Sequence, residues 1–449
     1  MKTKFVVVVA VLLFMLAGSV VQAQGGGETV ATGLNSPMGV LVAPDGSVWV
    51  IDSGMGGDEE IPFISPETGQ EITAQFGESA RIVQIAADGT QSDVAMLPSV
   101  LAGMEPIGGA RLAMVDGTLY ATAGQMLGEL GADAMENSAA VLKIEDGQVS
   151  EVASTWVVER DQNPDGTLVD SHPYGLTAAP DGSLWVTDAG ANDLLKVDPA
   201  SGEIEVVTAF DAVPSPLPSP TRDNALVTDP VPTGVVVDDS GTAYVSLLPG
   251  FPFVPGSSKV VQVSAGGDVT DYATGLTMLT DLRMAPDGNM YAVQVGQFTD
   301  QGPVPNMGRI IRIQPGDASE VVVDGLSFPT SIDFNDNGDA YVTINGVGAP
   351  GSGEVVMFAN LTGMAGTPVT EADAAAAASM AETDESSMAE GDSTEAMATD
   401  ETAPATEEAP ATLPTSGGEP VVAFWHLVIL GAALWGVGRW VKGYVWLVR

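Results

Sequence analysis

Four oxygen-bearing side chains within one ten-residue segment have the residue types of a calcium loop. The segment DQNPDGTLVD, residues 161–170, has Gly166 where such loops turn. Its candidate ligands are Asp161, Asn163, Asp165 and Asp170. Hard cations such as Ca²⁺ are bound by carboxylate and amide oxygens at this alternating spacing. Against a metal site, Pro164 interrupts the segment and His172 takes the twelfth position, where a calcium loop has glutamate. The segment therefore predicts either a calcium site or a polar, turn-rich loop without a metal.

A second set of side chains could perform acid–base chemistry. His172 lies at the start of a predicted inner strand, Asp188 ends another strand, and Asp281 and Arg283 begin a third. Carboxylates with one imidazole can hold a metal ion and activate water, as in lactonase-type enzymes. The alternative is that Asp188, in VTDAGAN, accepts hydrogen bonds from nearby backbone amides. No Ser-His-Asp order and no phosphate-binding glycine loop stands out, so the sequence favours a non-catalytic protein over an enzyme.

Aromatic and polar loop residues are further candidates for ligand contact. The loop PGFPFVPG carries Phe251 and Phe253, and the phrases SHPYGL and DAGANDLL carry Tyr174 and Asn192. Exposed aromatic side chains commonly mark a ligand or partner surface. The alternative is that the proline-rich loop folds over the central channel as a hydrophobic plug.

A repeated hairpin must position these side chains. Each copy has a glycine in a tight turn and an aromatic residue three positions later, which predicts two strands joined by a turn. The copies are APDGSVWV (43–50), MVDGTLYA (114–121), APDGSLWV (179–186), DDSGTAYV (238–245), APDGNMYA (285–292) and NDNGDAYV (335–342).

A third strand follows each hairpin, and a fourth follows five of them. Four antiparallel strands per unit, repeated six times, predict an all-β fold, a six-bladed β-propeller. The sixth copy lacks a fourth strand of its own, but residues 29–31 read like one. We therefore expect this N-terminal strand to complete the last blade and close the ring. The long segments follow second strands or join blades, so they predict one loop-rich face that carries the site around the channel.

Several loop phrases carry a family resemblance. NPDG (163–166), SHPYGL (171–176), VTDAGANDLLKVD (186–198), VPTGV (231–235) and GFPFVPGSSKV (250–260) resemble the ScyD/ScyE family of secreted six-bladed propellers related to NHL repeats. The resemblance covers roughly residues 29–358, and His172 stands where the family pattern has asparagine. It implies the fold and export, and it implies no particular reaction.

Composition limits the partners. The chain has a formal net charge of −44, no cysteine and 45% hydrophobic residues. Such an acidic surface repels the phosphates of nucleic acid, so we expect no nucleic-acid partner. Without cysteine, disulfides and thiolate metal sites are excluded.

The ends of the chain predict an exported, tethered protein. Residues 1–23 have the layout of a secretory signal peptide, and residues 24–362 form the predicted propeller. An acidic low-complexity linker (363–412) predicts a disordered stalk. It leads to the LPTSG motif (413–417), a transmembrane helix (421–440) and a short basic cytoplasmic tail (441–449). LPTSG resembles the signals that sortases cut, with Ser416 in place of threonine, so we expect anchoring to the cell membrane or the cell wall.

Together these features predict a surface-displayed binding or scaffold propeller. Its expected partner is an extracellular protein, a glycan or a small molecule. A metal-dependent, lactonase-like hydrolase on the loop-rich face and a structural protein of the cell envelope are the alternatives.

Overall fold

The computed structural model describes residues 26–64, 71–102, 105–127, 135–299 and 302–370. The predicted signal peptide, sorting-like motif, membrane helix and basic tail, with most of the linker, lie outside these ranges. Within them, no helix is long and apolar enough to cross a membrane.

The hairpin repeat forms strands as the sequence predicts. In the third copy, β14 (Pro173–Ala178) and β15 (Leu184–Asp188) pair antiparallel across a turn. In that turn the Asp181 carboxylate accepts hydrogen bonds from the backbone and hydroxyl of Ser183, and Gly182 has a φ of +82°. A glycine is favoured there because side chains rarely adopt this conformation. β16 (Asp193–Val197) and β17 (Ile204–Ala209) complete the sheet.

The same antiparallel arrangement of four successive strands recurs around the described chain. The first sheet contains β2 (Pro37–Val42), β3 (Val48–Asp52), β5 (Glu71–Ile85) and β6 (Gln91–Ala102), extended by β7 (Glu105–Ile107), and the second contains β8 (Gly109–Val115), β9 (Thr118–Ala123), β11 (Ala140–Glu145) and β12 (Gln148–Ser154). The fourth sheet contains β20 (Pro232–Val237), β21 (Ala243–Leu247), β22 (Ser258–Val263) and β23 (Val269–Leu276), and the fifth contains β24 (Leu279–Met284), β25 (Met290–Gln294), β28 (Gly308–Ile313) and β29 (Glu320–Leu326). The sixth sheet contains β30 (Ser331–Phe334), β31 (Ala340–Ile344) and β32 (Gly353–Phe358) with β1 (Glu28–Leu34). Chains built in this way are β-propellers.

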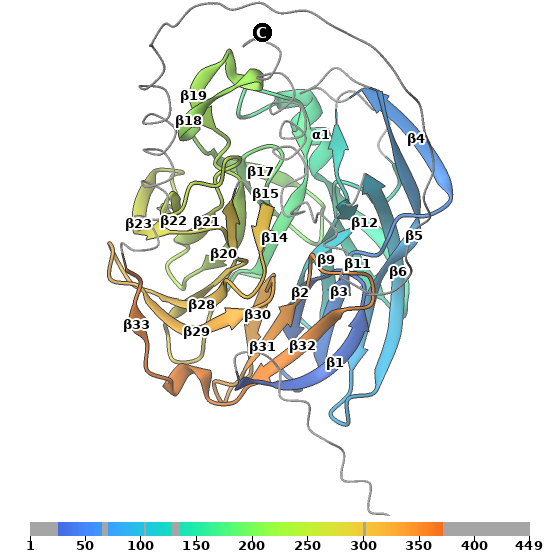
Figure 1. The fold of residues 1–449 in the computed structure, drawn as a ribbon. Helices are drawn as coiled ribbons and strands as arrows, with labels where there is room; N and C mark the ends of the chain where they lie inside the picture. Colours follow the sequence, from blue (N-terminus) through green and yellow to red (C-terminus); the bar gives the residue numbers. More distant parts are fainter. Residues whose placement is uncertain (1–25, 65–70, 103–104, 128–134, 300–301, 371–449) are drawn as a thin grey trace, which may run out of the picture.

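The N-terminal strand closes the ring, as predicted. β1 pairs antiparallel with β32, from Glu28 opposite Met357 to Leu34 opposite Gly353. Figure 1 shows β1 (blue) beside β32 (orange), so the first and the last unit of the repeat share one sheet. The Leu34 side chain is fully buried, and β1 covers the edge that β32 would otherwise expose.

The first strands of the sheets surround the central axis. β2, β8, β14, β20, β24 and β30 contact one another in this order, and β30 contacts β2 again. Glycines permit the close approach: a Cβ on Gly175 of β14 would lie 2.0 Å from the Thr233 carbonyl oxygen, and one on Gly234 of β20 would lie 2.1 Å from the Leu282 nitrogen. Apolar side chains fill the space between neighbouring sheets.

The segments predicted as long loops contain elements of their own. β4 (Glu59–Ile64) extends the first sheet, and α1 (Thr155–Gln162), β10 (Met126–Leu127) and β13 (Asp170–Ser171) lie between the second and third sheets. Two further long segments contain hairpins. β18 (Val213–Ser219) pairs with β19 (Ala225–Thr228), and β26 (Gln297–Thr299) pairs with β27 (Gly302–Val304). Their backbone groups need partners, and local pairing supplies them. Figure 1 shows β4, α1, β18 and β19 together at one end of the molecule.

The described structure continues past the predicted end of the propeller at residue 362. After the short 3₁₀ helix Leu361–Gly363, β33 (Thr367–Pro368) pairs with β29, and the Val369 nitrogen donates to the Ser319 carbonyl oxygen. The first residues of the predicted linker therefore pack on the domain.

Candidate functional site

A buried arginine occupies the axis. Arg111, in β8, has no exposed surface, and its guanidinium donates to backbone carbonyls from several sheets. One nitrogen, Nη1, bonds the carbonyl oxygens of Met38 and Ala110, and Nη2 bonds those of Thr280 (2.5 Å) and Thr330 (2.9 Å). The four acceptor residues lie in, or directly before, the first strands of four separate sheets. Arg111 therefore links these four sheets at the centre of the ring.

Asp281 balances this charge. Its Oδ1 lies 3.3 Å from Arg111 Nε, and its Oδ2 accepts from the Ser331 hydroxyl (2.6 Å) and the Ile332 nitrogen (3.2 Å). Arg283, the other predicted residue of β24, has its Nε 3.8 Å from Asp281 Oδ2. Asp281 and Arg283 therefore do lie together at the axis. Sequence reasoning missed Arg111, although a charged residue in the apolar strand GARLAMV was a visible signal.

An aromatic cluster covers one side of this network. The Arg111 guanidinium lies 4.5 Å from the centroid of the Tyr174 ring, and Tyr174 is 1% exposed. Phe253 is buried in the same cluster, and Phe251 and Phe298 pack against it, with Phe251 and Phe253 edge to face at 6.1 Å. The predicted aromatic loop therefore packs as a plug, which is the second of its two sequence interpretations.

The Asp188 side chain accepts hydrogen bonds from nearby backbone amides, which is the second of its two sequence interpretations. Its Oδ1 accepts from the His172 nitrogen (2.6 Å) and the Ala191 nitrogen (3.1 Å), and its Oδ2 accepts from the Ser171 hydroxyl (2.7 Å). Asp52, at the matching position of the first sheet, accepts from backbone nitrogens in the same way. The His172 ring lies edge-on to Tyr174 at 5.9 Å. Asn192 is buried and bonds Asp165 through Nδ2.

The buried imidazole makes stability depend on pH. Burial lowers the pKa of His172 from 6.5 to about 4, so in the folded chain it stays neutral where the unfolded chain takes up a proton. The neutral His172 side chain makes its full contribution to the free energy of unfolding above pH 6.5. This contribution is lost as the pH falls toward 4, by about 3 kcal/mol at most. Urea unfolding between pH 4 and 7 should therefore show a steeper loss in the native chain than in His172→Asn. Equal slopes in both chains would contradict the prediction.

The predicted calcium loop does not gather its four ligands. Asp161 pairs with the adjacent Arg160 and its side chain is 55% exposed, whereas Asp170 is buried and accepts from Gln125. Asp165 accepts from the backbone and hydroxyl of Thr167. The helix α1 explains the outcome, because it places Asp161 on the outer surface. Among the residues that the structure describes, no three His, Asp or Glu side chains form a group ready to hold a metal ion.

Two other carboxylates nearby are buried with no positively charged partner. Glu159 of α1 and Asp193 of β16 are each 1% exposed, and neither oxygen of Glu159 nor Oδ1 of Asp193 accepts a hydrogen bond. Burial, then the charges of Asp188 and Asp165, raise the pKa of Glu159 to about 8. Burial, then Asp188 and Glu159, raise the pKa of Asp193 well above its ordinary value. Neither residue was predicted as a site residue from the sequence.

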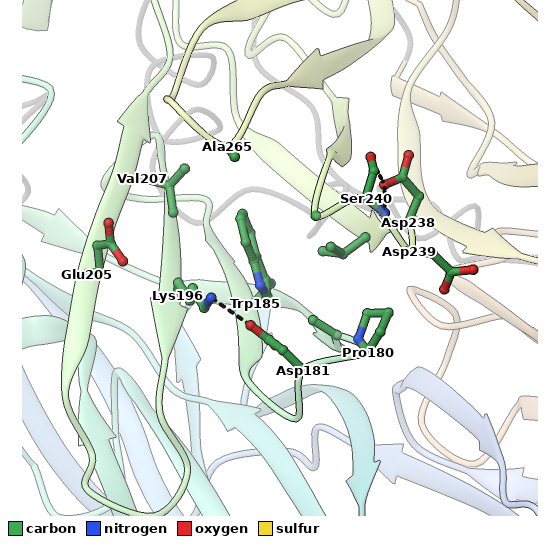
Figure 2. Close-up of a pocket in the computed structure, with 13 residues that line it drawn as sticks. Pro180, Asp181, Trp185, Lys196, Glu205, Val207, Asp238, Asp239, Ser240 and Ala265 are labelled. Atoms are coloured by element: carbon green, nitrogen blue, oxygen red, sulfur yellow. Dashed lines mark hydrogen bonds and ion pairs between the residues drawn. The ribbon is translucent and has the colours of Figure 1, made fainter.

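A groove of about 420 Å³ lies on the opposite, short-turn face. It runs between the third and fourth sheets, and Figure 2 shows Trp185 standing within it, with the ion pair of Lys196 and Asp181 (2.8 Å) to one side. Glu205 and Asp239 contribute exposed carboxylates to its walls. The site predicted from the sequence lies on the loop-rich face, and this groove was not predicted because its walls come from sheets that only the ring brings together.

Comparison with known proteins gives one family match. Residues 172–348 match the model described as the SMP-30/gluconolactonase/LRE-like region. The matched segment is less than half of the chain. It includes Asp188, Asp281 and Arg283, and it leaves out Arg111. No curated protein matches the chain by sequence.

Solved structures with a similar arrangement are β-propeller-like proteins. A gluconolactonase from Xanthomonas campestris is 13% identical over 76% of this chain and 93% of its own, with a TM-score of 0.42. A calcium-binding regucalcin from Agrobacterium tumefaciens is 14% identical over 76% and 95%, with a TM-score of 0.40. Virginiamycin B lyase from Staphylococcus aureus is 13% identical over 72% and 94%, also at 0.40.

The residues at the axis of this chain do not fit a bound cation. The charged groups around Asp281 are the guanidinium groups of Arg111 and Arg283, which would repel a metal ion. Asp281 is already paired with both arginines.

Proposed function

We propose that this chain is an exported, six-bladed propeller of the ScyD/ScyE type that acts as a binding module at the cell surface. The six successive sheets, each built on four antiparallel strands, support the blade number. The signal-like N-terminus, the acidic stalk and the C-terminal apolar segment support export and tethering.

The observation that carries this proposal is the filled axis. Arg111 forms an ion pair with Asp281 and donates hydrogen bonds to the backbone of the ring, and the aromatic cluster packs against it. Side chains engaged in this way hold a scaffold rigid, and a rigid scaffold can present surfaces for binding.

The groove at Trp185 is the surface that we assign to the ligand. Trp185 is only 5% exposed and forms the packed floor of the groove, so the exposed carboxylates of its walls are the groups that can accept hydrogen bonds from ligand hydroxyl groups. Glu205 and Asp239 are exposed and make no ion pair among the described residues. A polyhydroxylated ligand such as a glycan therefore fits this groove.

A charge-reversal experiment tests the groove. Full-length protein in mild detergent is applied to an array of immobilised glycans, beside Glu205→Lys/Asp239→Lys and the control Glu151→Lys, which changes an exposed carboxylate of β12. The groove variant should bind roughly tenfold more weakly or worse, and the control should bind like the native chain. Binding of equal strength in all three would exclude the groove, and no glycan binding at all would favour a protein ligand or a purely structural envelope role.

The family match over residues 172–348 favours a second candidate, a lactonase-like hydrolase. Incubation of the full-length protein with gluconolactone and divalent metal ions, followed with a pH indicator, decides between the two. Under our proposal, no turnover above buffer is expected. Turnover that disappears in His172→Ala or Asp188→Asn would establish the enzyme instead.

A further inference from the structure

The chain leaves the last sheet at the strand that closes the ring. β32 lies between β31 and β1, so a pull on its C-terminal end would act directly on the pairing of β1 with β32. The chain does not leave the domain there. Residues 359–370, which we call the strap, first pass from the sixth sheet to the fifth, where Figure 1 shows β33 near β29.

The first part of the strap is fastened to the sixth sheet. Leu361 is fully buried in an apolar cluster that the fifth and sixth sheets share. The Asn360 nitrogen donates to Asp339 Oδ1 (2.7 Å). The Thr362 nitrogen donates to the Gly338 carbonyl oxygen (3.3 Å), and a Cβ on Gly338 would lie 2.1 Å from Thr362 Oγ1. The strap therefore fits closely against the turn between β30 and β31.

Arg312 of β28 holds the middle of the strap. Its Nη2 donates to the carbonyl oxygens of Met364 (2.8 Å) and Thr362 (3.4 Å). The other side of the guanidinium is held by the fifth sheet, because Nε bonds the Tyr291 hydroxyl (3.0 Å) and Nη1 pairs with Glu320 (2.9 Å). The Arg312 side chain is 14% exposed. Hydrogen bonds from a charged donor are the stronger kind, so this contact is a firm attachment.

The fifth sheet differs from the others at this position of the repeat. Arg312 lies opposite Tyr291, the repeated aromatic residue of the second strand. The residues opposite the equivalent aromatics of the other sheets are Gln84, Lys143, Lys196, Gln262 and Met357. Only a guanidinium has a planar fork that can hold several acceptors at once. The arginine thus occurs in the sheet that the strap crosses.

The end of the strap covers the outer edge of the fifth sheet. β33 pairs antiparallel with the start of β29, and the Val369 nitrogen donates to the Ser319 carbonyl oxygen (3.0 Å). A Cβ on Gly366 would lie 2.6 Å from Glu320 Cβ, so the two backbones approach closely. The strap is therefore attached at three successive places before the stalk begins.

We propose that the strap is a mechanical anchor, which passes tension from the stalk into the fifth sheet and keeps it away from the closure of the ring. The inference rests on the tether in the proposed function. A pull at residue 370 acts first on β33 and then on Arg312, because the contacts nearest the pulled end must break before those behind them. While these contacts hold, β32 carries no load and its pairing with β1 stays intact.

Single-molecule pulling on the full-length protein in detergent tests the anchor. The chain has no cysteine, so Ala265→Cys in the groove and Thr370→Cys at the end of the strap supply the only two thiols for DNA handles. At constant force, release of the strap should appear as a separate first step of at most about 40 Å, the extended length of residues 359–370. Opening of the ring should follow as a longer step.

Arg312→Gln and Lys143→Gln are compared in this background. Glutamine is the residue that the first and fourth sheets have at this position, and Lys143 is its counterpart in the second sheet, far from the strap. The strap should release roughly tenfold faster in Arg312→Gln and at the native rate in Lys143→Gln. The later ring-opening step should be the same in all three, which separates loss of the anchor from general destabilisation.

Two results would overturn the anchor itself. One is an equal lifetime of the first step in the native chain and Arg312→Gln, and the other is ring opening without a separate short step. The tether is tested independently, by sedimentation of the full-length chain and of a chain that ends at Pro420 with cell membranes. Full-length protein that does not sediment would overturn the tether, and with it the role of the strap, even where the lifetimes differ.

Discussion

Arg111→Met should destabilise the protein by about 3–5 kcal/mol, because it removes the closer of the two guanidinium groups that balance the buried Asp281 carboxylate and leaves only Arg283, 3.8 Å away. The substitution also leaves the carbonyl oxygens of Thr280 and Thr330 without their donor. Urea unfolding of the two chains, followed by tryptophan fluorescence, measures the difference.

Two companion variants separate charge from geometry. Arg111→Lys keeps a cation but has no planar fork to reach acceptors on several sheets, so it should recover only part of the lost stability. Arg111→Met with Asp281→Asn removes both charges and should be less destabilised than the sum of the single changes. A loss below about 1 kcal/mol in Arg111→Met would show that the ring does not depend on this network.

Gly175→Ala should be the most damaging of the small substitutions. The added Cβ would lie 2.0 Å from the Thr233 carbonyl oxygen and 2.4 Å from Thr187 Oγ1, both at the contact between β14 and β20. The backbone at Thr233 cannot move without shifting a whole sheet. We therefore expect the free energy of unfolding to fall by roughly 3 kcal/mol or more, or the variant to fail to fold. The midpoint of urea unfolding reports it.

Gly266→Ala is the matched control. Gly266 lies in the exposed turn between β22 and β23, and its Cβ would meet nothing closer than 3.6 Å. This change should alter stability by no more than about 0.5 kcal/mol. Similar losses in the two variants would indicate that the inner strands can separate to admit a methyl group.

The sequence alone determined the repeat and the closure of the ring. The Asp-Gly turns and the alternation around them are local signals, because a tight turn and a half-buried strand need particular residues at fixed offsets. The similarity of residues 29–31 to other fourth strands predicted the pairing of β1 with β32, which the structure confirms. The backbone role of Asp188 was also among the interpretations drawn from its motif.

Only the tertiary structure decided which side chains act together. Arg111 meets Thr280 and Thr330 across more than 160 positions of the chain, and no local pattern links them. Sequence spacing records neighbours along a strand or helix, whereas burial and charge at the axis depend on how separate sheets close into a ring. For that reason the strands could be predicted and the sites could not.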